Sequence, residues 1–228
     1  MKKFKKRKYR INKNVFFNED SDTQFISLFS GCGGLDIGAI LNGYKVISSL
    51  DNNHDSIETL KLNKVFYKTE HNLSDIRKIN ARDYSQAMKK NNPQKLFLMR
   101  GPPCQPFSKA AYWQTHSKRK GDKDPKNMID PYLDLIDEMK PDGFILENVE
   151  SILHPKNLLY LQHIKERIFN LGFNLKIHKL NSADFGVPQK RKRVFFIAKL
   201  TSSSEDIVPT HGNEKAIILN PRLKNYER

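Results

Sequence analysis

The amino-acid sequence predicts an α/β fold with a doubly wound, mostly parallel sheet. Short apolar runs alternate with segments of helical periodicity, which is typical of a parallel sheet with helices on both faces. Glycines or acidic residues directly follow several of the predicted strands. Because such sheets bind their ligands beyond the carboxyl ends of the strands, these residues indicate where a functional site lies.

The predicted elements follow one another in a regular order. Apolar runs predict strands at residues 25–29, 44–50, 95–99, 143–146, 175–180 and 194–198. Helices are expected after the first strand up to Leu41, around Ile57 and Leu60, after Asp75, at 128–139 and at 157–171, where apolar residues recur every three or four positions. Residues 100–127 show no periodicity and predict a long polar loop, and the chain from residue 201 onward is expected to be irregular.

The chain is strongly basic. Its 228 residues suit one large domain, or one domain with appendages. Of the formal net charge of +15, eight charges lie in residues 1–13, which contain no acid, so the rest of the chain carries +7. The basic excess favours a polyanionic partner such as nucleic acid. The N-terminal arm, residues 1–24, is interpreted either as a solubilising tail or as a segment that contacts phosphates.

Several classes of protein are excluded at this stage. No apolar run is long enough to span a membrane. Two cysteines, Cys32 and Cys104, cannot form a disulfide framework or a multi-cysteine zinc site, so no metal is expected. No signal peptide is visible, because no apolar stretch follows the charged N-terminus. We therefore expect a cytoplasmic protein.

A glycine-rich turn and a following acid suggest a nucleoside site. Gly31, Gly33 and Gly34 link a strand to a helix, where glycine allows a tight turn and close approach of a ligand. Asp51 ends the next strand and can accept both hydroxyls of a ribose. Asp36 stands where the dinucleotide pattern requires glycine, which favours a nucleoside without phosphates, such as S-adenosylmethionine. The alternative is an ordinary turn with a solvent-facing Asp51.

Other polar residues have two interpretations. Asp75 could cap a helix or accept from an adenine amino group. Cys104 follows two prolines in a polar turn, which favours a reactive thiol over a buried one. Glu147, at the end of a buried strand, could cap a helix or share a proton with a heterocycle nitrogen. Arg191 and Arg193 are two residues apart, so their side chains point the same way in an extended chain. They are interpreted either as a solvated basic edge or as residues of the functional site.

Together these segments resemble the cytosine-C5 DNA methyltransferase family. The matching blocks are FISLFSGCGGLDIG (25–38), LD (50–51), SDI (74–76), GPPCQPFS (101–108), FILENV (144–149) and DFGVPQKRKRVFFI (184–197). They occur in the family's order and cover about residues 25–199. The resemblance implies a Rossmann-like, S-adenosylmethionine-dependent methyltransferase fold over residues 25–200.

The resemblance also implies residue roles in catalysis. Cys104 would attack C6 of a flipped-out cytosine in DNA, so that C5 can take the methyl group. Glu147 would contact N3 and the exocyclic amine, Arg193 would hold O2, and Arg191 would support the active loop and a phosphate. Residues 105–126 would form the mobile loop that closes over the base.

The S-adenosylmethionine site would be formed by residues of several blocks. Phe29 would pack against adenine, Asp51 would hold the ribose, and Asp75 and Ile76 would contact adenine. The full set that the resemblance implies is Phe29, Gly31, Gly33, Gly34, Leu35, Asp51, Asp75, Ile76, Pro103 and Met128. Asn52 and Ser27 depart from the family's usual residues, a bulky apolar side chain and an aspartate.

The largest departure is at the C-terminus. Residues 209–212 resemble the segment before the family's target-recognition region, and the chain ends at Arg228 in an irregular tail, 201–228. We expect a bacterial restriction-modification enzyme on double-stranded DNA, with a second protein chain carrying the recognition region and the final helix. The alternatives are a truncated remnant and a non-catalytic DNA-binding protein on the same fold. An RNA cytosine methyltransferase is less favoured, and Asp36 disfavours a nicotinamide dehydrogenase.

Overall fold

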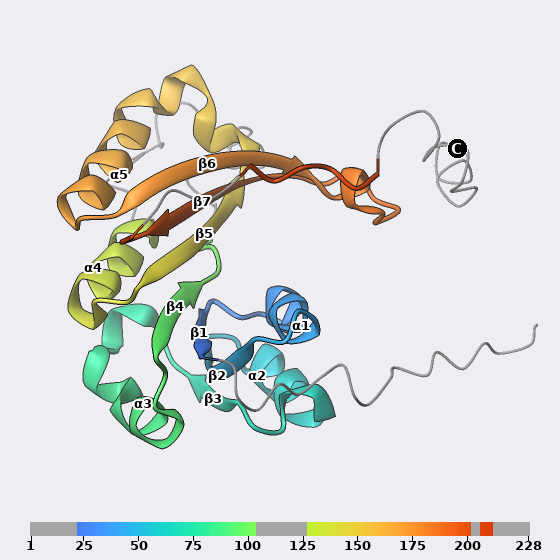
Figure 1. The fold of residues 1–228 in the computed structure, drawn as a ribbon, viewed down its shortest axis with the longest axis vertical. Helices are drawn as coiled ribbons and strands as arrows, with labels where there is room; N and C mark the ends of the chain where they lie inside the picture. Colours follow the sequence, from blue (N-terminus) through green and yellow to red (C-terminus); the bar gives the residue numbers. More distant parts are fainter. Residues whose placement is uncertain (1–21, 104–126, 202–205, 212–228) are drawn as a thin grey trace, which may run out of the picture.

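The computed structural model describes residues 22–103, 127–201 and 206–211 (Figure 1). These residues form a seven-stranded sheet with the order β3-β2-β1-β4-β5-β7-β6. The strands are β1 (Thr23–Leu28), β2 (Lys45–Asp51), β3 (Glu70–Leu73), β4 (Lys95–Met99), β5 (Gly143–Val149), β6 (Asn174–Asn181) and β7 (Lys192–Lys199). Strands β1 to β5 pair in parallel, whereas β7 is antiparallel to both β5 and β6. The predicted doubly wound, mostly parallel sheet is confirmed.

Helices lie on both faces of this sheet (Figure 1). The α-helices are α1 (Gly34–Leu41), α2 (His54–Leu62), α3 (Ser85–Asn91), α4 (Ile129–Met139) and α5 (Leu158–Asn170). Short 3-10 turns are η2 (Lys64–Phe66), η3 (Ile76–Lys78), η4 (Ala81–Tyr84), η8 (Glu150–Leu153), η9 (Pro155–Asn157) and η10 (Ser182–Phe185). The helix predicted after Asp75 is therefore wrong in type, since the chain forms two 3-10 turns before α3 begins. Strand β3 is also missing from the sequence-based prediction.

Each face of the sheet has its own apolar core. In β1 the side chains alternate between the faces, so Ile26 and Leu28 enter the larger core and Phe25 enters the smaller one. Helices α4 and α5 contribute to the larger core, whereas α1 and α2 contribute to the smaller one. Phe144 of β5 is fully buried in the larger core, edge-on to Tyr132 at 6.1 Å between ring centroids. These two cores hold the strand ends in fixed positions.

The two faces of β5 and β7 are covered unequally. Residues directly opposite each other in an antiparallel pair lie on the same face. On the face of α4 and α5, Leu146 and its partner Phe196 are fully buried. On the other face, Ile145 and Ile197 are half-buried. This second face also presents Glu147, and it is more open than the first.

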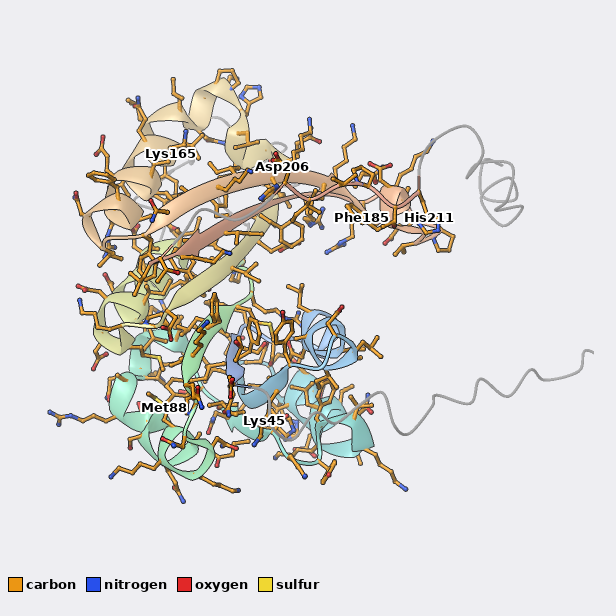
Figure 2. All side chains as sticks on the ribbon, in the orientation of Figure 1. Lys45, Met88, Lys165, Phe185, Asp206 and His211 are labelled. Atoms are coloured by element: carbon orange, nitrogen blue, oxygen red, sulfur yellow. The ribbon has the colours of Figure 1, made fainter. Side chains whose placement is uncertain are left out.

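The β6–β7 hairpin extends beyond the cores, and a short segment of the chain runs along it. Asp206 forms an ion pair with Lys176 of β6 at 2.8 Å. The backbone N–H of His211 donates to the carbonyl oxygen of Asp184 at 2.7 Å. Figure 2 shows Phe185 and His211 together near the tip of this hairpin. The segment that the sequence predicts to be irregular thus has no helix or strand over 206–211.

Some predictions lie outside the described residues. These are most of the N-terminal arm, Cys104 with the loop 105–126, and the chain from residue 212 onward. The division into 1–24, 25–200 and 201–228 therefore stays a prediction. Within the described ranges, no helix is long and apolar enough to cross a membrane, and no group of three potential metal ligands gathers.

Candidate active site

The predicted site residues follow the carboxyl ends of four neighbouring strands. Phe29 follows β1, Asp51 ends β2, residues 100–103 follow β4, and Glu147 lies near the end of β5. Two cavities lie here, one of about 410 Å³ and one of about 180 Å³. Phe29 lines both cavities, so they adjoin at its side chain.

The glycine turn after β1 has a conformation that requires glycine at Gly33. This residue has a φ of +81°, and a Cβ atom there would lie 2.8 Å from Leu60 and in closer conflict with the Phe66 ring. Gly31 also has a positive φ, +49°, whereas Gly34 begins α1 and lines the larger cavity together with Leu35. The turn therefore packs the start of α1 against the smaller core, and it places Gly34 and Leu35 in the lining of the larger cavity.

Asp51 is held at the smaller cavity by backbone donors. Its Oδ2 accepts from the N–H of Gly31 at 2.7 Å, and its Oδ1 accepts from the N–H of Asn53 at 2.9 Å. An ionised carboxylate has about four acceptor positions, so both oxygens can still accept from hydroxyl groups in the cavity. This acceptor set fits a ribose.

The smaller cavity brings together most of the predicted cofactor residues. Its lining consists of Phe29, Leu50, Asp51, Asn52, Ser74, Asp75, Ile76, Arg77, Pro103 and Met128. The apolar members can contact a planar heterocycle, and Asp75 can accept from an amino group. A nucleoside fits these residue types. Gly31 and Gly33 do not line this cavity. Gly31 donates its N–H to Asp51, and Gly33 allows the turn to pack closely on Leu60 and Phe66.

Asp75 makes the cap that the sequence predicts and is also paired with an arginine. Its Oδ1 accepts from the backbone N–H of Arg77 at 2.9 Å, which caps η3. The guanidinium of Arg77 donates from Nε to Oδ1 at 2.9 Å and from Nη2 to Oδ2 at 2.5 Å. These hydrogen bonds lower the pKa of Asp75 to about 2. Asp75 therefore stays ionised, as an acceptor, at neutral pH.

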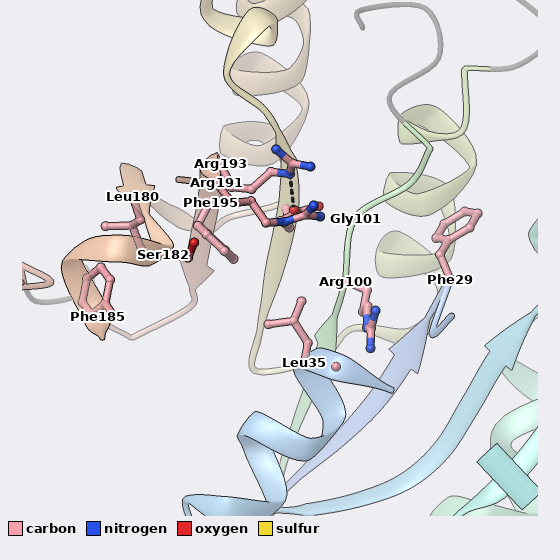
Figure 3. A pocket seen from close by; sticks show the side chains of 12 residues that line it. Phe29, Leu35, Arg100, Gly101, Leu180, Ser182, Phe185, Arg191, Arg193 and Phe195 are labelled. Atoms are coloured by element: carbon pink, nitrogen blue, oxygen red, sulfur yellow. Dashed lines mark ion pairs between the residues drawn. The ribbon is translucent and has the colours of Figure 1, made fainter. Parts of the chain in front are cut away.

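The larger cavity contains the acid and both arginines of the predicted catalytic set. Glu147 Oε1 lies 2.9 Å from Nε of Arg193, with both side chains about a quarter exposed. Arg191 lines the same cavity (Figure 3). Gly101 lies so close to β5 that a Cβ there would be 2.6 Å from the carbonyl carbon of Glu147. The turn that leads to Cys104 is thus packed directly on Glu147.

Arg100 is a residue of this cavity that the sequence analysis did not identify. It has a φ of +106°, which is uncommon for a residue other than glycine. Its Nε and Nη2 each lie 3.2 Å from Oδ1 of Asp36, which is fully buried in α1. The two residues are 64 positions apart, and no local pattern in the sequence could have connected them.

Comparisons with known proteins agree with this arrangement. The family model for C-5 cytosine-specific DNA methylases matches residues 23–227. The type II methyltransferase M.HindV of Haemophilus influenzae is 32% identical over 81% of this chain and 56% of its own length. M.AquIA of Picosynechococcus is 33% identical over 84% of this chain and 78% of its own length. A solved DNA modification methyltransferase from an E. coli prophage has a TM-score of 0.61 and 29% identity, over 78% of this chain and 46% of that one. The chain thus spans about half the length of several relatives.

Proposed function

The chain belongs to the C-5 cytosine-specific DNA methylase family, and we propose that it catalyses methyl transfer to C5 of cytosine in double-stranded DNA. The observation that carries the proposal is the position of Glu147, Arg193 and the Gly101 turn around one cavity, which adjoins the smaller cavity of Asp51 and Asp75. An acid, a cation and the turn before Cys104 meet there.

The reaction that we propose begins at Cys104. Its thiolate forms a bond to C6 of a cytosine turned out of the duplex, and the electron pair moves toward C5 and N3. Bound S-adenosylmethionine supplies the methyl group. The proton on C5 then passes to a base, the C5–C6 double bond re-forms, and the bond to Cys104 breaks, which restores the thiolate.

Glu147 and Arg193 would hold the cytosine in this reaction. The carboxyl group of Glu147 can share a proton with N3 and accept from the exocyclic amine, which favours electron flow toward N3. Arg193 is held beside it by the 2.9 Å ion pair and can donate to O2 of the base. Arg191 lines the same cavity and would support the active loop and a DNA phosphate.

The cofactor that fits the smaller cavity is S-adenosylmethionine. Asp51 would accept from the ribose hydroxyls, Asp75 from the adenine amino group, and Phe29 would pack against adenine. Ile76, Pro103 and Met128 complete the apolar lining. The two carboxylates would hold the nucleoside at this end, which would leave the sulfonium end toward the cavity of Glu147.

We further propose that target recognition is supplied by a second chain. M.AquIA, a type II methyltransferase, is matched over 78% of its length. The half-buried face of β5 and β7, with Ile145 and Ile197, is a surface on which further helical structure could pack. Restriction-modification, in the bacterial cytoplasm, is the setting that the type II relatives suggest.

A methylation assay tests both proposals. Duplex DNA of diverse sequence and, in a parallel reaction, RNA are each incubated with labelled S-adenosylmethionine and this chain, alone and together with the product of the adjacent reading frame. Transfer only with both products supports a two-chain enzyme, and transfer by the single chain would refute that part. No transfer under either condition favours a remnant or a non-catalytic DNA-binding protein, and transfer to RNA alone would refute DNA as the substrate.

A further inference from the structure

Arg100 lies where the glycine turn meets the larger cavity. It follows β4 directly and precedes the Gly101 turn, and it lines the cavity together with Phe29, Gly34 and Leu35. In Figure 3 its guanidinium lies between Leu35 and Phe29 in the view. Only 16% of the side chain is exposed, so the charge is placed inside the site.

A buried carboxylate fixes the direction of this guanidinium. Asp36 is fully buried and accepts from Ser27 Oγ at 2.7 Å and from Ser49 Oγ at 3.3 Å, as well as from Arg100. These hydroxyl bonds hold Asp36, and Asp36 in turn holds Nε and Nη2 of Arg100. The arginine is therefore oriented before any ligand binds, which lowers the entropic cost of binding.

The third nitrogen of the Arg100 guanidinium, Nη1, is the one that could bind a ligand. Nη1 makes no hydrogen bond within the described part of the chain, and it lies 3.8 Å from the position that a Cβ on Gly31 would occupy. It thus faces the glycine turn, where the first N–H groups of α1 also lack partners within the helix. Both features favour an anion at this position.

The other cations of the cavity are less suited to this role. Arg193 is paired with Glu147 at 2.9 Å, and Arg191 is exposed. Among the described lining residues, Arg100 is the cation beside the glycine turn. The bonds to Asp36 use Nε and Nη2 of Arg100, and Nη1 is directed toward the glycine turn.

We propose that Arg100 binds the carboxylate of the methionyl part of S-adenosylmethionine through Nη1, with Asp36 as the positioning residue. The inference rests on the proposed function, because it assigns a ligand group to the same cofactor site. Phe29 lines both cavities, so a cofactor with its nucleoside end in the smaller cavity would pass Phe29 with its methionyl end. Arg100, in the lining of the larger cavity, would then be the cation that receives the carboxylate.

The test removes the carboxylate from the ligand and the guanidinium from the protein. Calorimetry measures the binding of S-adenosylmethionine and of its decarboxylated analogue to the enzyme, with its second chain if one is required. We expect the wild type to prefer the carboxylated ligand by roughly 10-fold or more, as for a charge-assisted hydrogen bond. Arg100→Gln should lower this ratio to near 1. Arg193→Gln, a matched change in the same cavity, should preserve it.

Each other outcome has a defined meaning. If the wild type binds neither ligand, the proposed cofactor is wrong and the proposed function fails. If the wild type binds both ligands equally, or if Arg100→Gln keeps the preference, the role of Arg100 is refuted while the proposed function stands. Should Arg100→Gln fail to fold, the double variant Asp36→Asn, Arg100→Gln removes the unpaired buried charge and is measured in its place.

Discussion

Replacing Gly101 by alanine tests how closely the catalytic turn is packed on β5. A Cβ at this position would lie 2.6 Å from the carbonyl carbon of Glu147 and 2.9 Å from its Oε2, and nearer still to the carbonyl oxygen. Side-chain carbons keep about 3 Å or more from such atoms. Because the nearest of these atoms belongs to the backbone, the turn itself must move, by roughly 1 Å.

The consequences of this movement can be assigned approximate magnitudes. Overpacking of this kind costs about 1–3 kcal/mol of unfolding free energy, and the hydrogen bond from Arg100 N–H to Ile145 O, now 3.0 Å long, would weaken. A displacement of about 1 Å at a reacting group can lower turnover by roughly 100-fold. We therefore expect Gly101→Ala to lose both stability and methyl transfer.

The assay compares urea unfolding and methyl-transfer turnover in Gly101→Ala and in a control, Gly38→Ala. Gly38 lies inside α1, and a Cβ there meets nothing within 4 Å. Alanine is the better helix former by about 1 kcal/mol, so the control should be as stable as the wild type or more so, with full turnover. Wild-type stability and turnover in Gly101→Ala would refute the close packing.

Three further predictions concern the packing around the site. Asp36→Ala leaves a largely buried arginine without its partner, and urea unfolding should show a loss of about 3–5 kcal/mol; a loss below about 1 kcal/mol would contradict the buried pair. Arg77→Gln should raise the pKa of Asp75 from about 2 toward its ordinary value, as measured by carboxyl NMR titration. The stability that the ionised Asp75 contributes is present above about pH 4 and is lost as the pH falls through 2, so the two proteins should differ in stability at neutral pH and converge in strong acid. Phe144→Ala should cost about 3–5 kcal/mol, whereas Phe169→Ala, at a side chain that is 78% exposed, should change stability by less than about 0.5 kcal/mol.

The sequence predicts the parts of the fold that apolar periodicity determines. Strands such as β5 and β7 are apolar runs because both faces of the sheet are covered there at least in part. Strand β3 (Glu70–Leu73) reads Glu-His-Asn-Leu, and as an edge strand paired with β2 alone it needs no such run. After Asp75 the cap is predicted, but the chain forms short 3-10 turns in place of a helix, and nothing local determines that length.

The candidate site also contains residues that the sequence predicts and residues that it does not. Asp51 and Glu147 could be predicted because they stand at strand ends, and the topology of the sheet brings strand ends together. Arg100 could not, because its partner Asp36 is distant in the sequence and the pair forms only when α1 packs beside β4. The need for glycine at Gly101 depends on the distance to β5, which no property of the single residue reveals.

The central claim is methylation of C5 of cytosine through Cys104, and the methylated base tests it most directly. DNA treated with the enzyme, together with its second chain if one is required, and S-adenosylmethionine is digested to nucleosides and analysed by mass spectrometry against standards. We predict 5-methyl-2′-deoxycytidine from the wild type and none from Cys104→Ala. A methyl group on an exocyclic amine, or undiminished 5-methyl-2′-deoxycytidine from Cys104→Ala, would contradict the claim.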